Sequence, residues 1–147
     1  MLQELIKVKK LKQSAIIPTY ATDYAAGADL YACMEESIEI APHETKLIPT
    51  GLSMELPDGY AALVFARSGL SLKQDLAPAN KVGVIDSDYR GEYMVSLHNH
   101  GLETRTVSPN DRIAQLVIVP YVTAVFEEQT ELSETNRGTG GFGSSGK

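Results

Sequence analysis

Short apolar stretches separated by turn sequences run along most of this chain, and they constrain its fold more than any other feature. Tyr60–Ala66 (YAALVFA) and Arg112–Val119 (RIAQLVIV) are rich in the apolar residues that strands prefer. Pro57 and Gly59, just before the first of them, are the residues that tight turns favour. A short helix is expected only after Ser68–Gly69. Strands at this spacing without long helices between them predict an all-β, jelly-roll-like β-barrel or sandwich.

Three further stretches complete the expected strands. Thr45–Leu56 is predicted to be extended, and Val82–Asp86 and Glu92–Leu97 are predicted to pair as a hairpin around SDYRG. Alternation would place Asp86 and Asp88 on one face until the turn breaks the pattern. A carboxylate beside a tight turn can be held rigidly, as a general base must be. By itself the pattern favours a hairpin whose acids only solvate the bend.

The composition is that of one folded domain with a tail. The chain has 147 residues, of which 43% are hydrophobic and 22% are charged. Residues 1–136 are expected to form the β domain and residues 137–147 a flexible, Gly-rich C-terminal arm. Such a terminus is usually a disordered tail, but Arg137 and Phe142 add an anion binder and an aromatic ring that a linker does not need. The arm is therefore expected to be a flap that becomes ordered on ligand binding.

Charge and cysteine content exclude several classes of protein. A net charge of −6 without a basic stripe argues against a nucleic-acid polymer as partner, although a few focused arginines can still bind a small anion. One cysteine, Cys33, allows no internal disulfide and is expected to be a small core residue in a reducing compartment. No apolar run is long enough to span a membrane, and lysines interrupt the N-terminal apolar residues. We therefore expect a cytoplasmic protein with no membrane partner.

His98 and His100 are a candidate pair of metal ligands that we interpret otherwise. Two residues apart on a strand, both would point to one face. They flank an asparagine and precede Gly101, however, and a turn is expected there. We interpret them as solvated turn residues.

Polar residues that are candidates for a functional site occur in three other places. Arg67 and Ser68 stand where a strand gives way to the expected helix, so a guanidinium, a hydroxyl and backbone amides converge. Asp29 follows a glycine turn at Gly27. Gln115 is a polar amide within an apolar strand, and it requires a hydrogen-bond partner there.

Taken together, these stretches resemble the trimeric dUTPases, which hydrolyse dUTP to dUMP and pyrophosphate. The sequence motifs of that family occur here in order: AAGADLYA (Ala25–Ala32), RSGL (Arg67–Leu70), GVIDSDYRGE (Gly83–Glu92), DRIAQLV (Asp111–Val117) and RGTGGFGSSG (Arg137–Gly146). Ala66 and Ser71 depart from the proline and alanine common around the second motif. The resemblance implies a homotrimer of jelly-roll-like subunits with active sites at the subunit interfaces. It also implies a role in keeping uracil out of DNA and supplying dUMP for thymidylate synthesis.

The resemblance further implies a role for each residue of the motifs. Asp86 would orient and deprotonate the water that attacks the α-phosphorus, and Asp29 would hold Mg²⁺ through a water molecule. The other implied substrate-binding residues are Arg67, Ser68, Gly69 and Gln115 at the phosphates, Asn80, Val84, Ile85, Asp86 and Met94 at the uracil, Tyr89 at the sugar, and Arg137, Phe142, Gly143, Ser144 and Ser145 on a neighbouring subunit's arm. Phe142 would stack on the uracil ring, and Arg137 would grip the terminal phosphates.

Two other functions remain open for this scaffold. A dCTP deaminase of the same fold carries a different sequence after the Arg-Ser of the second motif and uses a glutamate for deamination, whereas RSGLSLKQ here matches the hydrolase form. A nucleotide-sensing regulatory protein is the second alternative. The intact set of Asp29, Arg67, Asp86 and Arg137 favours an enzyme over a sensor that has lost catalysis.

Overall fold

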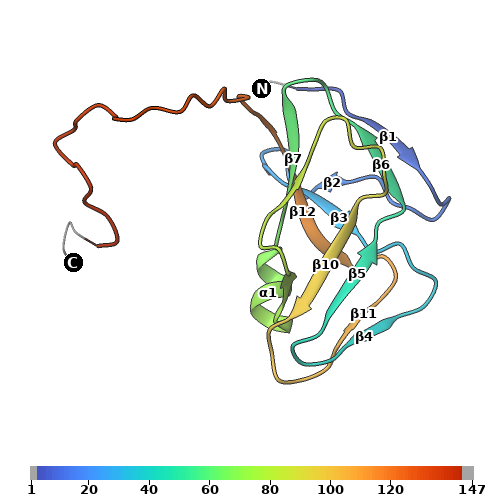
Figure 1. The fold of residues 1–147 in the computed structure, drawn as a ribbon. Helices are drawn as coiled ribbons and strands as arrows, with labels where there is room; N and C mark the ends of the chain where they lie inside the picture. The colour runs from blue at the N-terminus through green and yellow to red at the C-terminus, as the bar shows by residue number, and fades with distance from the viewer. Residues whose placement is uncertain (1–2, 144–147) are drawn as a thin grey trace.

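The computed structural model describes residues 3–143, and strands make up nearly all of its regular structure (Figure 1). In chain order the elements are β1 (Lys7–Lys10), β2 (Thr19–Tyr20), β3 (Ala28–Tyr31), β4 (Ile38–Ile40), β5 (Thr45–Pro49), β6 (Leu52–Glu55), β7 (Tyr60–Phe65), α1 (Ser68–Gln74), β8 (Leu76–Pro78), β9 (Gly83–Ile85), β10 (Met94–Asn99), β11 (Arg105–Val107) and β12 (Arg112–Pro120). The predicted all-β class and the short helix after Ser68–Gly69 are both confirmed. Within the described residues, no helix has the length and apolarity needed to cross a lipid bilayer.

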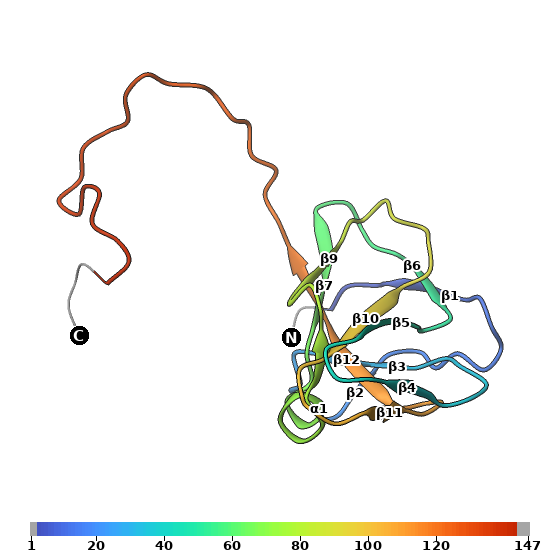
Figure 2. The ribbon, with the colours of Figure 1, turned by 60° about the horizontal axis from the view of Figure 1, so that its bottom comes forward.

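The strands form four antiparallel sheets that pack around one core (Figures 1 and 2). The largest has the strand order β2-β3-β12-β7-β9, and the second has the order β5-β10-β8. The two-stranded pairs β1-β6 and β11-β4 complete the layers. None of these sheets closes on itself, so the structure is a sandwich and not a closed barrel.

Apolar side chains from both large sheets meet in the core. The large aliphatic side chains that are almost completely buried are Leu30, Ile40, Ile48, Leu52, Leu76, Leu97 and Ile113. Along β10, buried residues alternate with partly or fully exposed ones, as a strand with one core-facing side requires. Cys33 is 4% exposed within this cluster, which confirms its prediction as a core residue. The packed sheets provide a rigid frame for the loops that join them.

The predicted hairpin between Val82–Asp86 and Glu92–Leu97 is wrong. β9 pairs with β7, whereas β10 pairs with β5 and β8, so the SDYRG turn crosses from one sheet to the other. β9 ends at Ile85, and the alternation expected for Asp86 and Asp88 does not reach them. The prediction failed because turn residues specify that the chain reverses but not which strand each side pairs with.

The predicted strand Thr45–Leu56 is interrupted at Gly51. This residue has a φ of 68° and separates β5 from β6. A Cβ atom there would lie 2.7 Å from the Sγ of Cys33, so both the backbone conformation and the space require glycine.

After β12 the chain leaves the sandwich. Residues 121–143 run away from the sheets (Figure 2). The amide of Tyr121 still donates to the carbonyl of Gly59 at 2.9 Å, and later bonds such as Arg137 Nε to the Gly140 carbonyl are local. The departure precedes the predicted boundary at residue 137, and that boundary and the flexibility of the arm stay predictions.

Candidate active site

Three adjacent strands of the largest sheet bring distant parts of the sequence into one row. Gln115 on β12 lies opposite Asp29 on β3 and also opposite Phe65 on β7. Arg67 follows β7 by two residues and is the N-cap of α1. The register of the sheet therefore places an acid, an amide and an arginine side by side at one edge of the core.

Asp29 lies between two arginines. Arg67 Nε donates to Asp29 Oδ1 at 2.7 Å, and Arg112 Nη1 lies 3.5 Å from Asp29 Oδ2. The Asp29 side chain is 10% exposed, so its charge is poorly solvated and depends on these partners. Arg67 Nη1 also donates to the main-chain carbonyl of Arg112 at 3.4 Å. Two cations beside one carboxylate leave a local positive charge that favours an anionic ligand.

Gln115, the polar residue within an apolar strand, has the hydrogen-bond partner that the sequence predicted. Its Nε2 donates to the carbonyl of Ala66 at 2.8 Å, which ties β12 to the segment that carries Arg67. Gly27 allows this arrangement, because a Cβ atom at that position would lie 2.6 Å from Gln115 Oε1.

These residues line a pocket of about 340 Å³. Its lining includes the predicted phosphate contacts and metal-binding residue, namely Asp29, Arg67, Ser68, Gly69 and Gln115, together with Gly27 and alanines of the preceding loop. The first helical bond of α1 runs from the Ser71 amide to the Arg67 carbonyl, so the amides of Ser68 and Gly69 have no acceptor within the helix. A guanidinium, a hydroxyl and backbone amides thus meet at one site, as the sequence predicted.

The predicted uracil and sugar contacts lie elsewhere: just before β9, on β9, in the turn that follows it and at the start of β10. We call these residues the β9 strip: Asn80, Val84, Ile85, Asp86, Tyr89 and Met94. All of them are exposed except Ile85, which is half-buried. The strip therefore presents a mixed polar and apolar surface to solvent.

Within one chain Asp86, at one end of the β9 strip, does not reach the arginine pocket. β9 runs antiparallel to β7 with Ile85 opposite Ala62, so Asp86 lies one step beyond that pair. Arg67 lies five residues from Ala62 in the other direction along the chain. Asp86 and Arg67 are therefore six residues apart along the direction of β7. At about 3.3 Å per residue, this is a separation of roughly 20 Å.

The arm residues form a third group. Arg137, Phe142 and Gly143 belong to residues 121–143. That segment runs away from the sheets (Figure 2). Phe142 is fully exposed. The predicted contacts Ser144 and Ser145 lie outside the described residues.

Of the two histidines, His98 differs from its predicted setting, whereas His100 is exposed and lies outside the strand, as predicted. β10 continues to Asn99, so His98 is a strand residue and not a turn residue, and its Nδ1 lies 2.8 Å from Thr45 Oγ1. The rings of His98 and His100 are 4.5 Å apart, edge to face. Across residues 3–143, no group of three or more His, Cys, Asp or Glu side chains is arranged to hold a metal ion.

The donors of the pocket suit Mg²⁺ only if a ligand supplies most of the coordinating oxygens. Asp29 is the one carboxylate among the described lining residues, and each of its oxygens faces an arginine. A carboxylate has about four acceptor positions, so some remain for water molecules. Mg²⁺ favours phosphate oxygens and retained waters over an all-protein cage. The residues therefore fit a divalent ion that arrives with a phosphorylated ligand.

Arg112 is a residue of the site that sequence reasoning missed. It stands at the start of β12, three residues before Gln115, in the same motif. A register shift between Arg112 and Ala114 places both Arg112 and Gln115 beside β3, next to the pocket. The presence of Arg112 in the same motif as Gln115 was the one signal in the sequence. The three-residue spacing between them did not reveal the bulge that brings both to the pocket.

Comparisons with known proteins agree on one family. The family model described as dUTPase matches residues 13–146. Deoxyuridine 5'-triphosphate nucleotidohydrolase of Hahella chejuensis is 50% identical over 145 residues, covering 97% of this chain and 95% of that protein. The protein of the same name from Syntrophotalea carbinolica is 48% identical over 141 residues, with 96% of each covered.

Solved structures show the same relationship. A mutant dUTPase of Staphylococcus bacteriophage 80alpha, solved with dUpNHpp, superimposes with a TM-score of 0.90 at 28% identity, covering 99% of this chain and 100% of that one. A mutant dUTPase of S. aureus phage phi11, whose description refers to coordination of a structural Mg(II) ion, gives a TM-score of 0.80 at 25% identity, covering 88% of this chain and 99% of that one.

Proposed function

The chain belongs to the dUTPase family, and on that premise we propose that it hydrolyses dUTP to dUMP and pyrophosphate in sites shared between subunits. The observation that carries the proposal is the meeting of Asp29, Arg67 and Gln115 in one pocket with a positive local charge. That pocket suits the phosphate chain of a nucleotide.

Arg67 is the main phosphate-binding group of the proposed site. Its Nε donates to Asp29 and its Nη1 to the Arg112 carbonyl, and these two bonds hold the guanidinium in place. The remaining N–H groups are available to phosphate oxygens in the geometry that arginine provides. Ser68 and Gly69 add a hydroxyl and a main-chain amide, and Gln115 supports the segment that carries them.

Asp86 is the proposed general base. Its carboxylate takes a proton from a water molecule as the oxygen of that water forms a bond to the α-phosphorus. The bond between that phosphorus and its bridging oxygen breaks, and pyrophosphate leaves with the electron pair. The exposed position of Asp86 leaves room for both the water and the nucleotide.

The distance between Asp86 and the arginine pocket supports a shared site. A nucleotide must contact the base and the phosphate-binding groups at once, and roughly 20 Å is too far for one chain to provide both. We propose a homotrimer in which the β9 strip of one subunit faces the arginine pocket of another, with closed symmetry generating equivalent sites.

A divalent ion, Mg²⁺ in this proposal, would neutralise the triphosphate when bound to it. Asp29 is the residue that would hold the ion, through water. The arginines on both sides hold that carboxylate in place as the nucleotide binds.

Selectivity for the nucleoside is assigned to the β9 strip. Asn80, Met94 and the main chain of residues 84–86 would contact the uracil edge, where cytosine would leave buried groups unpaired at a cost of about 1–3 kcal/mol each. Tyr89 would pack under the sugar and leave no room for a ribose 2′-hydroxyl.

The arm of a neighbouring subunit would close the site. Phe142 would stack on the base, while Arg137, Gly143, Ser144 and Ser145 would contact the phosphates. The exposed position of Phe142 supports this role, because nothing in its own subunit covers the ring among the described residues.

A pyrophosphate-release assay with dUTP, dCTP, dTTP and UTP, with and without Mg²⁺, tests the proposed function. We expect rapid release from dUTP with Mg²⁺ and little from the other nucleotides. Ammonia from dCTP without pyrophosphate from dUTP would instead identify a deaminase. Nucleotide binding without any product would identify a sensor.

A further inference from the structure

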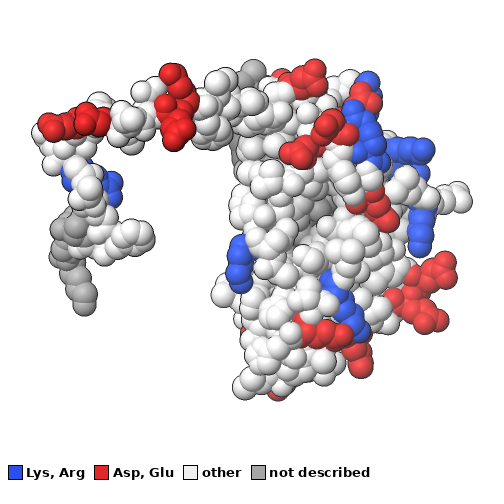
Figure 3. Space-filling view, viewed as in Figure 1, with Lys and Arg blue, Asp and Glu red and all other residues white. Residues whose placement is uncertain are grey.

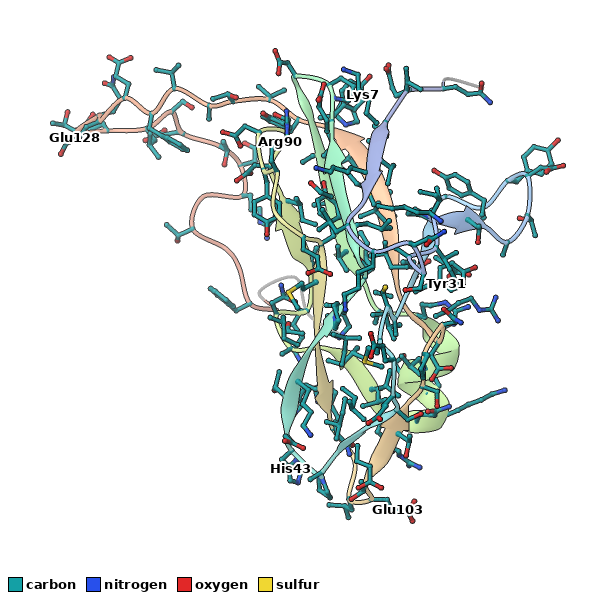
Figure 4. The ribbon with its side chains drawn as sticks, turned by 90° about the vertical axis from the view of Figure 1, so that its right-hand side faces the viewer. Lys7, Tyr31, His43, Arg90, Glu103 and Glu128 are labelled. Atoms are coloured by element: carbon teal, nitrogen blue, oxygen red, sulfur yellow. The ribbon has the colours of Figure 1, made fainter. Side chains whose placement is uncertain are left out.

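The turn that carries Asp86 and Tyr89 is bonded to the junction between β5 and β6. Ser53 Oγ donates to the Arg90 carbonyl at 2.6 Å, and the Tyr93 amide donates to the Leu52 carbonyl at 2.8 Å. Figure 4 shows Arg90 at the same end of the molecule as Lys7 and far from His43. The turn is thus held against the sandwich at this end of the molecule.

Glu92 connects the two parts of this arrangement. Its Oε1 accepts a hydrogen bond from the Gly51 amide at 2.8 Å. Its main-chain carbonyl accepts one from the Tyr89 hydroxyl at 3.0 Å. One half-buried residue therefore links the fixed β5–β6 junction to the ring of Tyr89.

Two glycines show how closely this geometry is specified. Gly51 is in the left-handed region, which interrupts regular pairing and leaves its amide to the Glu92 carboxylate. A Cβ atom at Gly91 would overlap the Tyr89 hydroxyl oxygen, so the tyrosine ring lies directly over that position. The Tyr93 ring lies behind it, with its centroid 6.1 Å from that of Tyr89. Tyr89 is therefore confined at its hydroxyl and beside its ring.

We propose that Glu92 is a positioning residue that holds Tyr89 in place and thereby enforces selectivity for deoxyribose over ribose. The inference rests on the proposed function, in which Tyr89 packs under the sugar. Glu92 acts as a hydrogen-bond acceptor for the Gly51 amide, so the acceptor and its reach matter and the negative charge does not.

Three substitutions of Glu92 separate the effects of the hydrogen-bond acceptor, its reach and the negative charge. Glu92→Gln keeps a carbonyl oxygen at the same reach, Glu92→Asp keeps the charge but is one methylene shorter, and Glu92→Ala removes the acceptor. In the full-length protein we measure kcat and KM for dUTP and for UTP. We expect the ratio of kcat/KM for dUTP to that for UTP to fall about tenfold or more in the Asp and Ala variants and to stay within about twofold in the Gln variant.

A matched control comes from the far end of the molecule. Glu44 Oε2 accepts a hydrogen bond from the Ala41 amide at 2.8 Å, the same kind of bond in a turn distant from Tyr89. Glu44→Ala should leave the dUTP to UTP ratio unchanged, whatever it does to the melting temperature. Ser53→Ala, which frees the turn at Arg90, provides a second test if Glu92→Ala does not fold, and it should also lower the ratio.

The outcomes distinguish this inference from the proposed function. If the wild-type protein does not hydrolyse dUTP, the proposed function is wrong. If it does, but the ratio is unchanged in Glu92→Asp and Ser53→Ala, the inference is wrong and the function stands. A Gln variant as impaired as the Ala variant, or a Glu44→Ala variant with the same loss, would also overturn it.

Discussion

Asp29 illustrates how one residue organises the arginine pocket. A carboxylate that is 10% exposed has lost most of its solvation, and the ion pairs with Arg67 and Arg112 compensate for that loss. Those contacts also restrain the guanidinium of Arg67, whose side chain is itself only 24% exposed. Less conformational entropy is then lost when a phosphate binds, so part of the ordering is complete before the ligand arrives.

At Asp86 we expect Asp86→Asn to bind nucleotide with nearly unchanged affinity but to lose about 10²–10⁴-fold in turnover. The amide keeps the shape of the side chain but cannot accept the proton from water. Pyrophosphate release measures turnover, and titration with a non-hydrolysable dUTP analogue measures binding. Turnover close to that of the wild type would rule out Asp86 as the base.

Tyr93 carries a buried hydroxyl without a hydrogen-bond partner among the described residues. It is 1% exposed, and burial raises the pKa of its phenol to about 12. An unpaired buried hydroxyl destabilises the folded state, so Tyr93→Phe should raise the free energy of unfolding by about 1 kcal/mol near pH 7. Thermal unfolding measures the change, and a lower melting temperature would show that the hydroxyl is satisfied in the assembled protein.

The same residue gives a pH dependence of known sign. Because the folded pKa of Tyr93 is raised above the ordinary value of 10, its neutral form stabilises the fold fully below pH 10. That contribution is lost as the pH rises from 10 through about 12. Stability of the wild type should therefore decrease more steeply over this interval than stability of Tyr93→Phe, as measured by urea unfolding at each pH.

Among the elements, β12 decides where the pocket forms. It is the central strand of the largest sheet, and it pairs with β3 on one side and with β7 on the other. Gln115 on β12 is therefore adjacent to both Asp29 and the segment that follows β7. The loop before β3 must approach this amide closely, and Gly27 permits it.

Gly27→Ala tests this junction between strands. Its Cβ atom would lie 2.6 Å from Gln115 Oε1, so the amide must move and its bond to the Ala66 carbonyl weakens. We expect kcat/KM for dUTP to fall about tenfold or more, because the Arg67 segment loses that support. Steady-state kinetics measures the loss. Unchanged kinetics would mean that Gln115 does not position the pocket.

For the whole molecule, charge and distance point to assembly. The chain carries a net charge of −6, and Figure 3 shows acidic side chains along the arm and basic ones gathered on the side of β1. The arginine pocket is thus a local positive region in an acidic protein, which suits a focused anion site and not a polymer surface. The separation of Asp86 from that pocket supports the proposal that the two parts of the site come together only between subunits.

Mixing two inactive variants tests the shared site directly. Asp86→Asn lacks the base and Arg67→Ala lacks the phosphate contact, so each homotrimer should be inactive. When equal amounts are unfolded and refolded together, roughly a quarter of all sites in the randomly assembled trimers pair an intact Asp86 with an intact Arg67. Recovery of about that fraction of wild-type turnover supports the shared site. No recovery, with mixed trimers verified by native mass spectrometry, contradicts it.

Much of the fold was predictable because it depends on local signals. The apolar runs at Tyr60–Ala66 and Arg112–Val119 became β7 and β12, and the helix began where Ser68 follows a strand. Pairing was not predictable in the same way. The strands on the two sides of the SDYRG turn pair in different sheets, and β10 continues through His98. Neither was predictable, because pairing depends on packing of residues far apart in the sequence.

The sequence by itself determined which chemical groups are present and which short segments are extended, because turn residues and apolar runs act over a few neighbouring positions. It also identified the family, since the motifs occur in order along almost the whole chain. Only the tertiary structure decided that Arg112 joins Asp29, that Glu92 reaches the Gly51 amide, and that Asp86 lies far from Arg67 in its own chain. These facts follow from strand register and sheet order, which are set by burial of the common core and not by any local pattern.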